Sequence, residues 1–389
     1  MPHTEKTLLH IASFDGNIGD NASHNGFYRQ LRENTGWKLS LDQREIRKTY
    51  LNYEGTDRWS WGDDLIRDMN NSDLTVIGGG NYFELWLENS ATGTTIDLDP
   101  ERLQDIKKPF FFHAVGCDPN IGVSDKTISR FRYFIETAVN HPLCVMSVRN
   151  DGSMKYLQRF LGDTLADRIL VTPDPGFFVD PGTTKPPAPI EGKTYWVLNL
   201  AMDRPERRFP GTNGKLDYSG FLAEIAVFIQ QACETYPALE IVLAPHIYSD
   251  LDPIRDVIAI LPDRIRRWRV SVAPLLHGMG AEKTLFALYR DAELALGPRF
   301  HANVCPIGLG TPSIGLVTTE KLVDLYDELG MPDRIIDTQT PGFSNALLQL
   351  ARATIKSDIQ IRADYAALRE TLSNQSSAVY QTVGRLVDQ

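Results

Sequence analysis

The stretch ALGPRFHANVCPIGLGTPSIGL, residues 295–316, passes from a buried-strand pattern to an apolar helical pattern and back to a strand. Such a handover is typical of a parallel α/β layer. Arg299 and His301 stand at the first junction. Burying an unpaired guanidinium costs several kcal/mol, so either a carboxylate of the chain or an anionic ligand must meet Arg299. The rest of the sequence favours the ligand.

The same alternation continues along the chain and predicts an α/β fold with two Rossmann-like domains that face each other across a cleft. The expected strands are TLLHIASF, KLSLDQREI, LTVIGGG, PFFFHAVG and LCVMSVR in the first half, and YWVLNLA, LEIVLAPH, RWRVSVA, AELALG and PSIGLV in the second. The expected helices are DNASHNGFYRQLREN, RWSWGDDLIRDMN, SDKTISRFRYFIETAV and NDGSMKYLQRFLG, then residues 217–235, 253–261, 281–290, 300–309 and 319–329, and the tail.

A chain of 389 residues exceeds one ordinary core, and the proline-rich stretch VDPGTTKPPAPIEGK, residues 179–193, predicts the linker. We expect an N-terminal domain over residues 1–185 and a C-terminal domain over 190–355. A C-terminal helix over 356–389 could pack back on the N-terminal domain.

The composition excludes several classes of protein. Hydrophobic residues make up 42%, charged residues 23%, and the net charge of −10 argues against a nucleic-acid partner. No apolar run approaches the ~20 residues of a membrane span, and the N-terminus does not resemble a signal peptide. The four cysteines are far apart in apolar contexts, which favours buried thiols, a reducing compartment and hence a cytoplasmic protein. We see no metal-ligand cluster.

Two glycine-containing loops follow predicted strands. In SFDGNIGDNASHNG, Asn17, Gly19 and Asp20 form a strand–helix turn that either caps the helix or presents backbone N–H groups to a ligand. In VIGGGNYFELW, the run of Gly78, Gly79 and Gly80 before Asn81 is costly in chain entropy. Close approach of a ligand to the backbone is the interpretation we favour for it.

Several titratable residues end predicted strands. Arg149 in SVRNDGS points toward the expected cleft, although pairing with Asp151 on the surface would explain it too. His113 and His246 are as readily buried as catalytic, and His10 is expected in the core. The sequence gives Asp174 a turn-forming role.

Two stretches, DRIRRWRV and RPERRF, are basic clusters in an acidic chain. Such clusters are usually solvated surface. A weaker alternative is docking on the phosphate groups of a lipid surface.

Taken in order, six motifs resemble the bacterial polysaccharide pyruvyl transferase family: GNIGDNA, VIGGGN, SVRNDGS, TPDPGF, GPRFHANVCPIGLGTPSIGL and EKLVDLYDELGM. The resemblance implies a two-domain arrangement of the GT-B glycosyltransferase type. It also implies transfer of the enolpyruvyl carbons of phosphoenolpyruvate onto two hydroxyls of one sugar, as a pyruvate ketal. No cofactor is implied, since phosphoenolpyruvate is a co-substrate.

By the same resemblance, Arg149, Arg299 and His301 fall on positions that hold phosphoenolpyruvate. Asn17 and Asp20 fall on a loop that faces the cleft from the other domain, with the glycine loop beside the acceptor. We expect His301 to contact the phosphate or donate a proton, and Asp20 to act as general base, with His113 as the rival base.

The chain departs from the family at Asn21, Phe300 and His113, which affects the acceptor side. Two alternatives stay open: a GT-B glycosyltransferase that uses a nucleotide-sugar, and a non-catalytic sugar- or phosphate-binding protein of a polysaccharide-synthesis complex. Also open are the identity of the sugar, whether the acceptor is lipid-linked, whether the protein docks on a membrane surface, and whether it forms a homo-oligomer.

Overall fold

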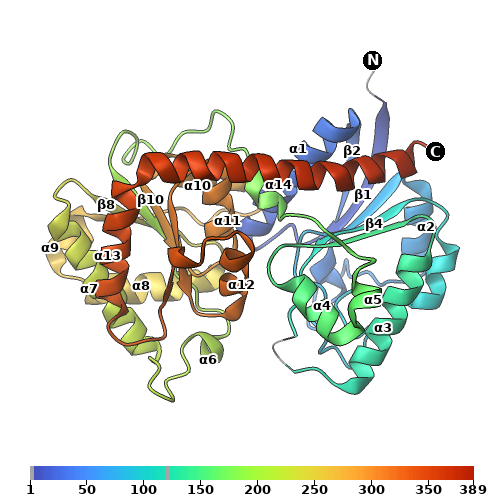
Figure 1. The fold of residues 1–389 in the computed structure, drawn as a ribbon, viewed down its shortest axis with the longest axis horizontal. Helices are drawn as coiled ribbons and strands as arrows, with labels where there is room; N and C mark the ends of the chain where they lie inside the picture. Colours follow the sequence, from blue (N-terminus) through green and yellow to red (C-terminus); the bar gives the residue numbers. More distant parts are fainter. Residues whose placement is uncertain (1–3, 120–121) are drawn as a thin grey trace. The chain divides into compact units, whose positions relative to one another are not determined.

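The computed structural model describes residues 4–119 and 122–389, and the chain divides into two compact α/β units (Figure 1). The first unit comprises Met1–Phe14, Phe27–Pro175 and Thr371–Gln389, and the second comprises Asp15–Gly26 and Gly176–Glu370. Each unit is built on its own parallel sheet of six strands. The fold is therefore α/β with two Rossmann-like units, as the sequence predicts.

The sheet of the first unit has the strand order β2-β1-β3-β4-β5-β6. Its strands are β1 (Glu5–Ala12), β2 (Lys38–Glu45), β3 (Leu74–Gly78), β4 (Phe110–Val115), β5 (Cys144–Val148) and β6 (Leu170–Val171). The order reverses between β1 and β3, so the carboxyl ends of these two strands form the switch point at which ligands of α/β sheets bind.

The sheet of the second unit has the order β12-β11-β10-β7-β8-β9. Its strands are β7 (Tyr195–Leu198), β8 (Glu240–Leu243), β9 (Val270–Val272), β10 (Leu294–Gly297), β11 (Ser313–Val317) and β12 (Ile335–Asp337). Here the order reverses between β7 and β10, which register Leu294 opposite Trp196. Arg299 follows β10 directly and so lies at this switch point.

Helices connect the strands in both units. The first unit holds α2 (Asp63–Asn71), α3 (Asp125–Asn140), α4 (Ser153–Leu161) and α5 (Asp163–Ala166). The second holds α6 (Pro205–Arg208), α7 (Tyr218–Thr235), α8 (Leu251–Ile260), α9 (Asp263–Trp268), α10 (Ala281–Asp291), α11 (His301–Leu309), α12 (Glu320–Glu328) and α13 (Phe343–Lys356). Two helices are divided between the units: α1 (Ile18–Thr35) and α14 (Asp358–Val387).

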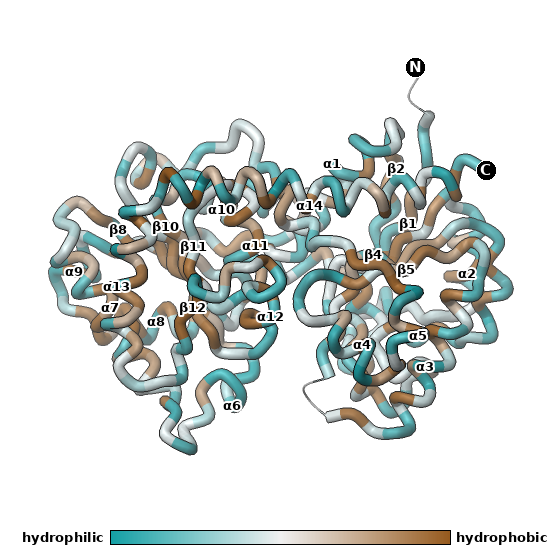
Figure 2. The backbone as a smooth tube through the Cα atoms, in the orientation of Figure 1, coloured by the Kyte–Doolittle hydropathy of each residue, from teal (hydrophilic) through white to brown (hydrophobic). Residues whose placement is uncertain are grey.

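Apolar side chains account for the positions of the strands. All six residues of β4, FFFHAV, are buried, as expected of a parallel strand covered on both faces. Figure 2 shows hydrophobic strands inside each unit and hydrophilic loops outside them. Helix α3 begins where the sequence places a cap, because the Ser124 hydroxyl and the Thr127 side chain each accept an N–H of the other residue.

The structure differs from the expected elements at a few places. The strands β6 and β12 and the helices α5, α6, α9 and α13 are additional, and α2 begins at Asp63, after the aromatic stretch that was expected to open it. No described helix is long and apolar enough to cross a membrane.

The expected linker and the expected first helix need correction. The proline-rich stretch lies in the second unit, where the Arg290 guanidinium donates to the carbonyl oxygens of Gly182 and Thr184, both at 2.9 Å. Residues 15–26 also belong to the second unit, not to the first. The loop of Asn17 and Asp20 is therefore on the same unit as Arg299.

Candidate functional site

Arg299 is held by two carboxylates of its own unit. Its Nε donates to Oδ2 of Asp250 at 2.7 Å, its Nη2 also contacts Oδ1 of Asp250, and Nη2 donates to Oδ1 of Asp203 at 2.7 Å. Burial lowers the pKa of the guanidinium, but Asp250 and Asp203 more than offset this, so the pKa of Arg299 is raised. Of the two partners that the sequence left open for Arg299, the structure shows carboxylates of the chain, although the anionic ligand was favoured.

The two carboxylates differ in their surroundings. The Asp250 side chain is fully buried and also accepts the backbone N–H of His246, at 2.9 Å. The Asp203 side chain is 36% exposed and shares its charge between Arg299 and a second arginine, Arg208. The buried Asp250 carboxylate thus orients the Arg299 guanidinium from the interior, whereas the Asp203 carboxylate contacts it on the solvent side.

Arg208, on the short helix α6, is buried and not solvated surface as its basic cluster suggested. Its Nη2 donates to both Asp203 carboxylate oxygens at 3.2 Å, and its Nε donates to the Asp203 carbonyl at 2.8 Å. Nη1 donates to the Thr318 hydroxyl, which follows β11, at 2.6 Å. Two largely buried guanidinium groups therefore flank one partly exposed carboxylate at the carboxyl edge of the sheet.

His301 opens helix α11 and lies against the start of α1. Its Nδ1 is 4.0 Å from Oδ1 of Asp20, and both side chains are largely buried. A Cβ added at Gly19 would lie 2.6 Å from His301 Nδ1. Position 19 therefore has to be glycine, because any side chain there would clash with the imidazole. The Asn17 side chain accepts the N–H of Gly19 at 3.1 Å and caps α1.

One backbone hydrogen bond joins the start of α1 to the loop that follows strand β8. The N–H of Ile18 donates to the carbonyl of His246 at 3.1 Å. The His246 ring is buried, lies 2.9 Å from the Tyr289 hydroxyl, and its pKa falls well below 6.5 through burial and the nearby positive charge of Arg299. His246 is therefore neutral near pH 7 and forms part of the support of the site.

A second cluster lies at the carboxyl edge of the first sheet. Arg149, 4% exposed, donates from Nε to Oδ2 of Asp151 at 2.6 Å and from Nη1 to Oδ2 of Asp174 at 3.4 Å. Pairing with Asp151 was foreseen as a surface contact, but the pair is buried. Asp174, expected to be a turn-former, is a buried partner of the guanidinium.

The glycine loop meets Arg149 over Gly116. A Cβ added at Gly116 would lie 2.4 Å from Oδ1 of Asn81 and 2.8 Å from Nη2 of Arg149. The structure thus brings together Asn81 and Arg149, which the sequence placed at the ends of separate strands.

The fold itself explains the glycine run. A Cβ at Gly78 would lie 1.9 Å from the carbonyl oxygen of His113 on β4, and Gly79 has a φ of 79°. The N–H of Gly79 donates to that same carbonyl at 2.9 Å. Close approach of a neighbouring strand, rather than of a ligand, therefore accounts for Gly78, and Gly80 packs against the Tyr82 ring.

The His113 side chain lies in the core of the first unit. It is 1% exposed, its Nε2 lies 3.0 Å from the Tyr380 hydroxyl, and it packs against Phe27 and Phe111. His10 is fully buried, as expected, with Nδ1 2.6 Å from the Tyr28 hydroxyl.

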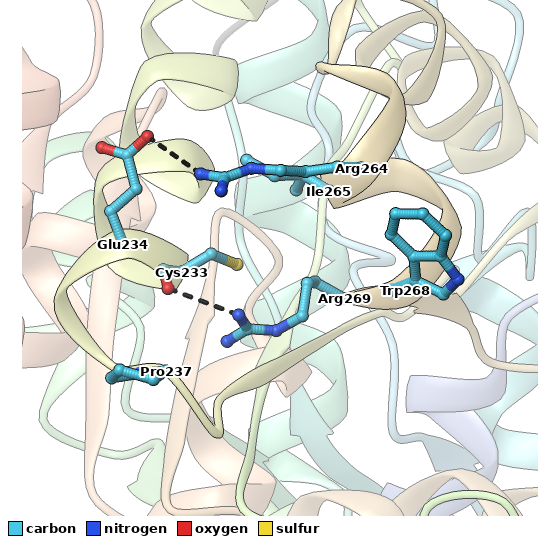
Figure 3. Close-up of a pocket in the computed structure, with 7 residues that line it drawn as sticks. All are labelled: Cys233, Glu234, Pro237, Arg264, Ile265, Trp268 and Arg269. Carbon is cyan, nitrogen blue, oxygen red and sulfur yellow. Dashed lines mark hydrogen bonds and ion pairs between the residues drawn. The ribbon is translucent and has the colours of Figure 1, made fainter.

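The stretch DRIRRWRV forms α9, Arg269 and the first residue of β9, the edge strand of the second sheet. Figure 3 shows several of its side chains, among them Arg264, Trp268 and Arg269. Arg264 pairs with Glu234 at 3.6 Å, while Arg269 donates to carbonyls at the end of α7, including Tyr236 O at 2.8 Å. Trp268 is 71% exposed. This cluster is mostly solvated, in keeping with the commoner meaning of basic runs, and one of its arginines caps a helix.

Asp203, Arg208 and Asp250 were missed as site residues. Each follows a predicted strand by a few positions, as Arg299 does, so the rule that selected Arg299 could have selected them. Their mutual pairing gives no sequence signal, because Asp250 and Arg299 are 49 positions apart.

Solved structures resemble the whole chain. A putative UDP-N-acetylglucosamine 2-epimerase from Listeria monocytogenes has a TM-score of 0.56 at 10% identity, over 98% of this chain and 94% of its own. The N-terminal domain of trehalose-6-phosphate phosphatase from Candida albicans gives 0.53 at 13% identity, over 98% and 99%. MnaA of S. aureus, solved with UDP, gives 0.51 at 11% identity, over 98% and 94%. At such identities the likeness shows the fold alone.

A comparison with curated proteins gave no match. A family model, in contrast, matches residues 17–320, which include the α1 turn, the glycine loop, Arg149, Arg299 and His301. The match covers well over half of the chain and spans both units. The chain therefore belongs to the polysaccharide pyruvyl transferase family.

Proposed function

We propose that the protein moves the enolpyruvyl group of phosphoenolpyruvate onto two hydroxyls of one sugar, forming a cyclic pyruvate ketal and releasing phosphate. Family membership supports a saccharide acceptor. The observation that carries the proposal is the cluster at the second switch point. There a buried, oriented guanidinium, Arg299, stands two residues from an imidazole, His301, that lies beside the Asp20 carboxylate. Such a cluster suits an anionic donor and a reaction that moves protons.

The reaction requires three proton movements. A proton must be added to C3 of the donor, so that C2 becomes electrophilic and the first hydroxyl attacks it while losing its own proton. The second hydroxyl then attacks C2, loses its proton, and the C2–O bond to phosphate breaks. We assign proton donation or phosphate contact to His301 and the general base to Asp20, roles worth about 10²–10⁴-fold in rate.

The other predicted residues have less direct support. His113 is the weaker candidate for the base, because its ring is buried and Nε2 contacts the Tyr380 hydroxyl. Arg149 stays a prediction as a donor-binding residue, and Asn81 with the glycine loop stays a prediction for the acceptor side.

The test is release of inorganic phosphate from phosphoenolpyruvate in the presence of galactosides, glucosides and mannosamine derivatives, with mass spectrometry of the sugar product. Asp20→Asn and His301→Gln should each lower kcat by about 10²-fold. The matched control is His277→Gln, an exposed histidine of the same unit. Saturable binding of a nucleoside diphosphate without phosphate release would favour a glycosyltransferase. Ligand binding without turnover would favour a non-catalytic protein.

A further inference from the structure

The carboxylate of Asp203 bridges two largely buried cations, Arg299 and Arg208. The side chains of Arg299 and Arg208 are 13% and 9% exposed, while the Asp203 side chain that bridges them is 36% exposed. Buried guanidinium groups are costly without an anion, so this position must be occupied in the ligand-free protein. Asp203 is the exposed member of the group and hence the one that can leave.

Both arginines keep their orientation without Asp203's carboxylate. Arg299 remains held through Nε and Nη2 by Asp250, which is fully buried. Arg208 remains held through Nε by the backbone carbonyl of Asp203 and through Nη1 by the Thr318 hydroxyl. Rotation of the Asp203 side chain would release one N–H of the Arg299 Nη2, which keeps its other bond to Asp250, and the Nη2 of Arg208.

The segment that carries Asp203 is anchored beside this position. Arg204 adopts a φ of 54°, in the left-handed region that non-glycine residues rarely occupy. The Gln339 side chain donates to the carbonyls of Arg207 and Arg208 at 3.0 and 3.1 Å and to that of Thr318 at 3.2 Å. The backbone is thus fixed, and exchange needs only side-chain rotation.

Charge balance supports the exchange. Two guanidinium groups face two carboxylates in the cluster, and the cations lower the pKa of Asp203 against the opposing effect of burial. The Asp203 carboxylate is therefore ionised near neutral pH and competes with any anion for the same N–H groups. Phosphate fits the vacated donors, because its oxygens accept from two arginines at once.

We propose that Asp203 occupies the phosphate subsite of the donor as a built-in competitor, and that Arg208 is a second phosphate-binding arginine beside Arg299. Only the identity of the donor rests on the proposed function. The exchange itself is a property of the cluster and is tested with inorganic phosphate.

The experiment is titration calorimetry of the full chain with inorganic phosphate at neutral pH, for the wild type and four variants. Asp203→Asn and Asp203→Ala should bind phosphate about tenfold more tightly, because the competing charge is gone. Asp250→Asn should bind it at least tenfold more weakly, because the Arg299 fork loses its support. The matched control is Asp263→Asn, whose exposed carboxylate also lies between two arginines, Arg266 and Arg267, and whose affinity should not change.

Unchanged or weaker phosphate binding in both Asp203 variants, with melting temperatures showing that they are folded, would overturn the proposal. If Asp203 had only a structural role, replacing it would lower the melting temperature and would not increase the affinity for phosphate. Failure of the proposed function is separable: tighter phosphate binding without turnover of phosphoenolpyruvate leaves the exchange standing. Turnover of phosphoenolpyruvate without tighter phosphate binding removes the exchange alone.

Discussion

At the scale of single residues, the neighbours of His301 and Arg299 determine how these two side chains are positioned. Sequence position alone placed both at the carboxyl end of a strand, and the structure agrees. The pairing of Arg299 with Asp250 could not be predicted, since the two residues meet through a contact between positions far apart in the chain. The sequence likewise indicated Gly19 only as a turn residue. The structure shows that a side chain at this position would clash with the His301 imidazole.

Gly19→Ala should leave the fold intact and impair catalysis. Alanine suits a helix better than glycine by about 1 kcal/mol, but its Cβ would meet the His301 ring and its Cβ at 2.6–2.7 Å. We expect kcat for phosphate release to fall at least tenfold in a protein that still folds, with a lower melting temperature because the clash with the His301 Cβ outweighs the gain in helix propensity. Gly62→Ala is the control, because its Cβ meets nothing closer than 3.5 Å. Full activity of Gly19→Ala would mean that the position of His301 is unimportant.

At the scale of elements, apolar runs predicted the long buried strands but not the short ones. The run FFFHAV is unmistakable, whereas β6 has two residues and β12 three, too few for a period to be read. Contacts between elements are equally invisible to local patterns. The sequence did not decide whether His113 on β4 is buried or catalytic, because its partner Tyr380 on α14 is 267 positions away.

Tyr380→Phe should destabilise the protein and leave catalysis unchanged. The variant removes one buried hydrogen bond to the His113 ring, at a cost of about 1–3 kcal/mol in the free energy of unfolding, measured with urea. The rate of phosphate release from folded protein should match the wild type. Tyr133→Phe, at a half-exposed tyrosine, serves as control. A large loss of kcat without loss of stability would instead assign His113 a chemical role.

At the scale of the whole molecule, the alternation of strand and helix patterns predicted the fold class but not the division of the chain into two units. The proline-rich stretch is a local signal, but the units are defined by contacts that local composition does not encode. Stability against pH is another property of the whole. His246 has a pKa well below 6.5 when folded, so the unfolded chain binds a proton first as the pH falls.

The stabilising effect of the neutral His246 is thus fully present above about pH 6.5 and is lost as the pH falls toward its folded pKa. We expect the urea-derived free energy of unfolding to drop between pH 7 and pH 5 by up to about 1.4 kcal/mol per pH unit for this proton. In His246→Gln this part of the slope should vanish, while His277→Gln should retain it. Equal slopes in all three proteins would contradict the assignment.

The placement of residues 15–26 has a consequence for biosynthesis. During translation this segment leaves the ribosome long before residue 301 exists, and at ordinary elongation rates the interval is on the order of tens of seconds. The contact between Asp20 and His301 can therefore form only late in translation, and the same holds for the contact between His113 and Tyr380. Neither unit is formed by one continuous segment of the chain. Two fragments produced by a single cut would therefore each lack a segment that belongs to their unit.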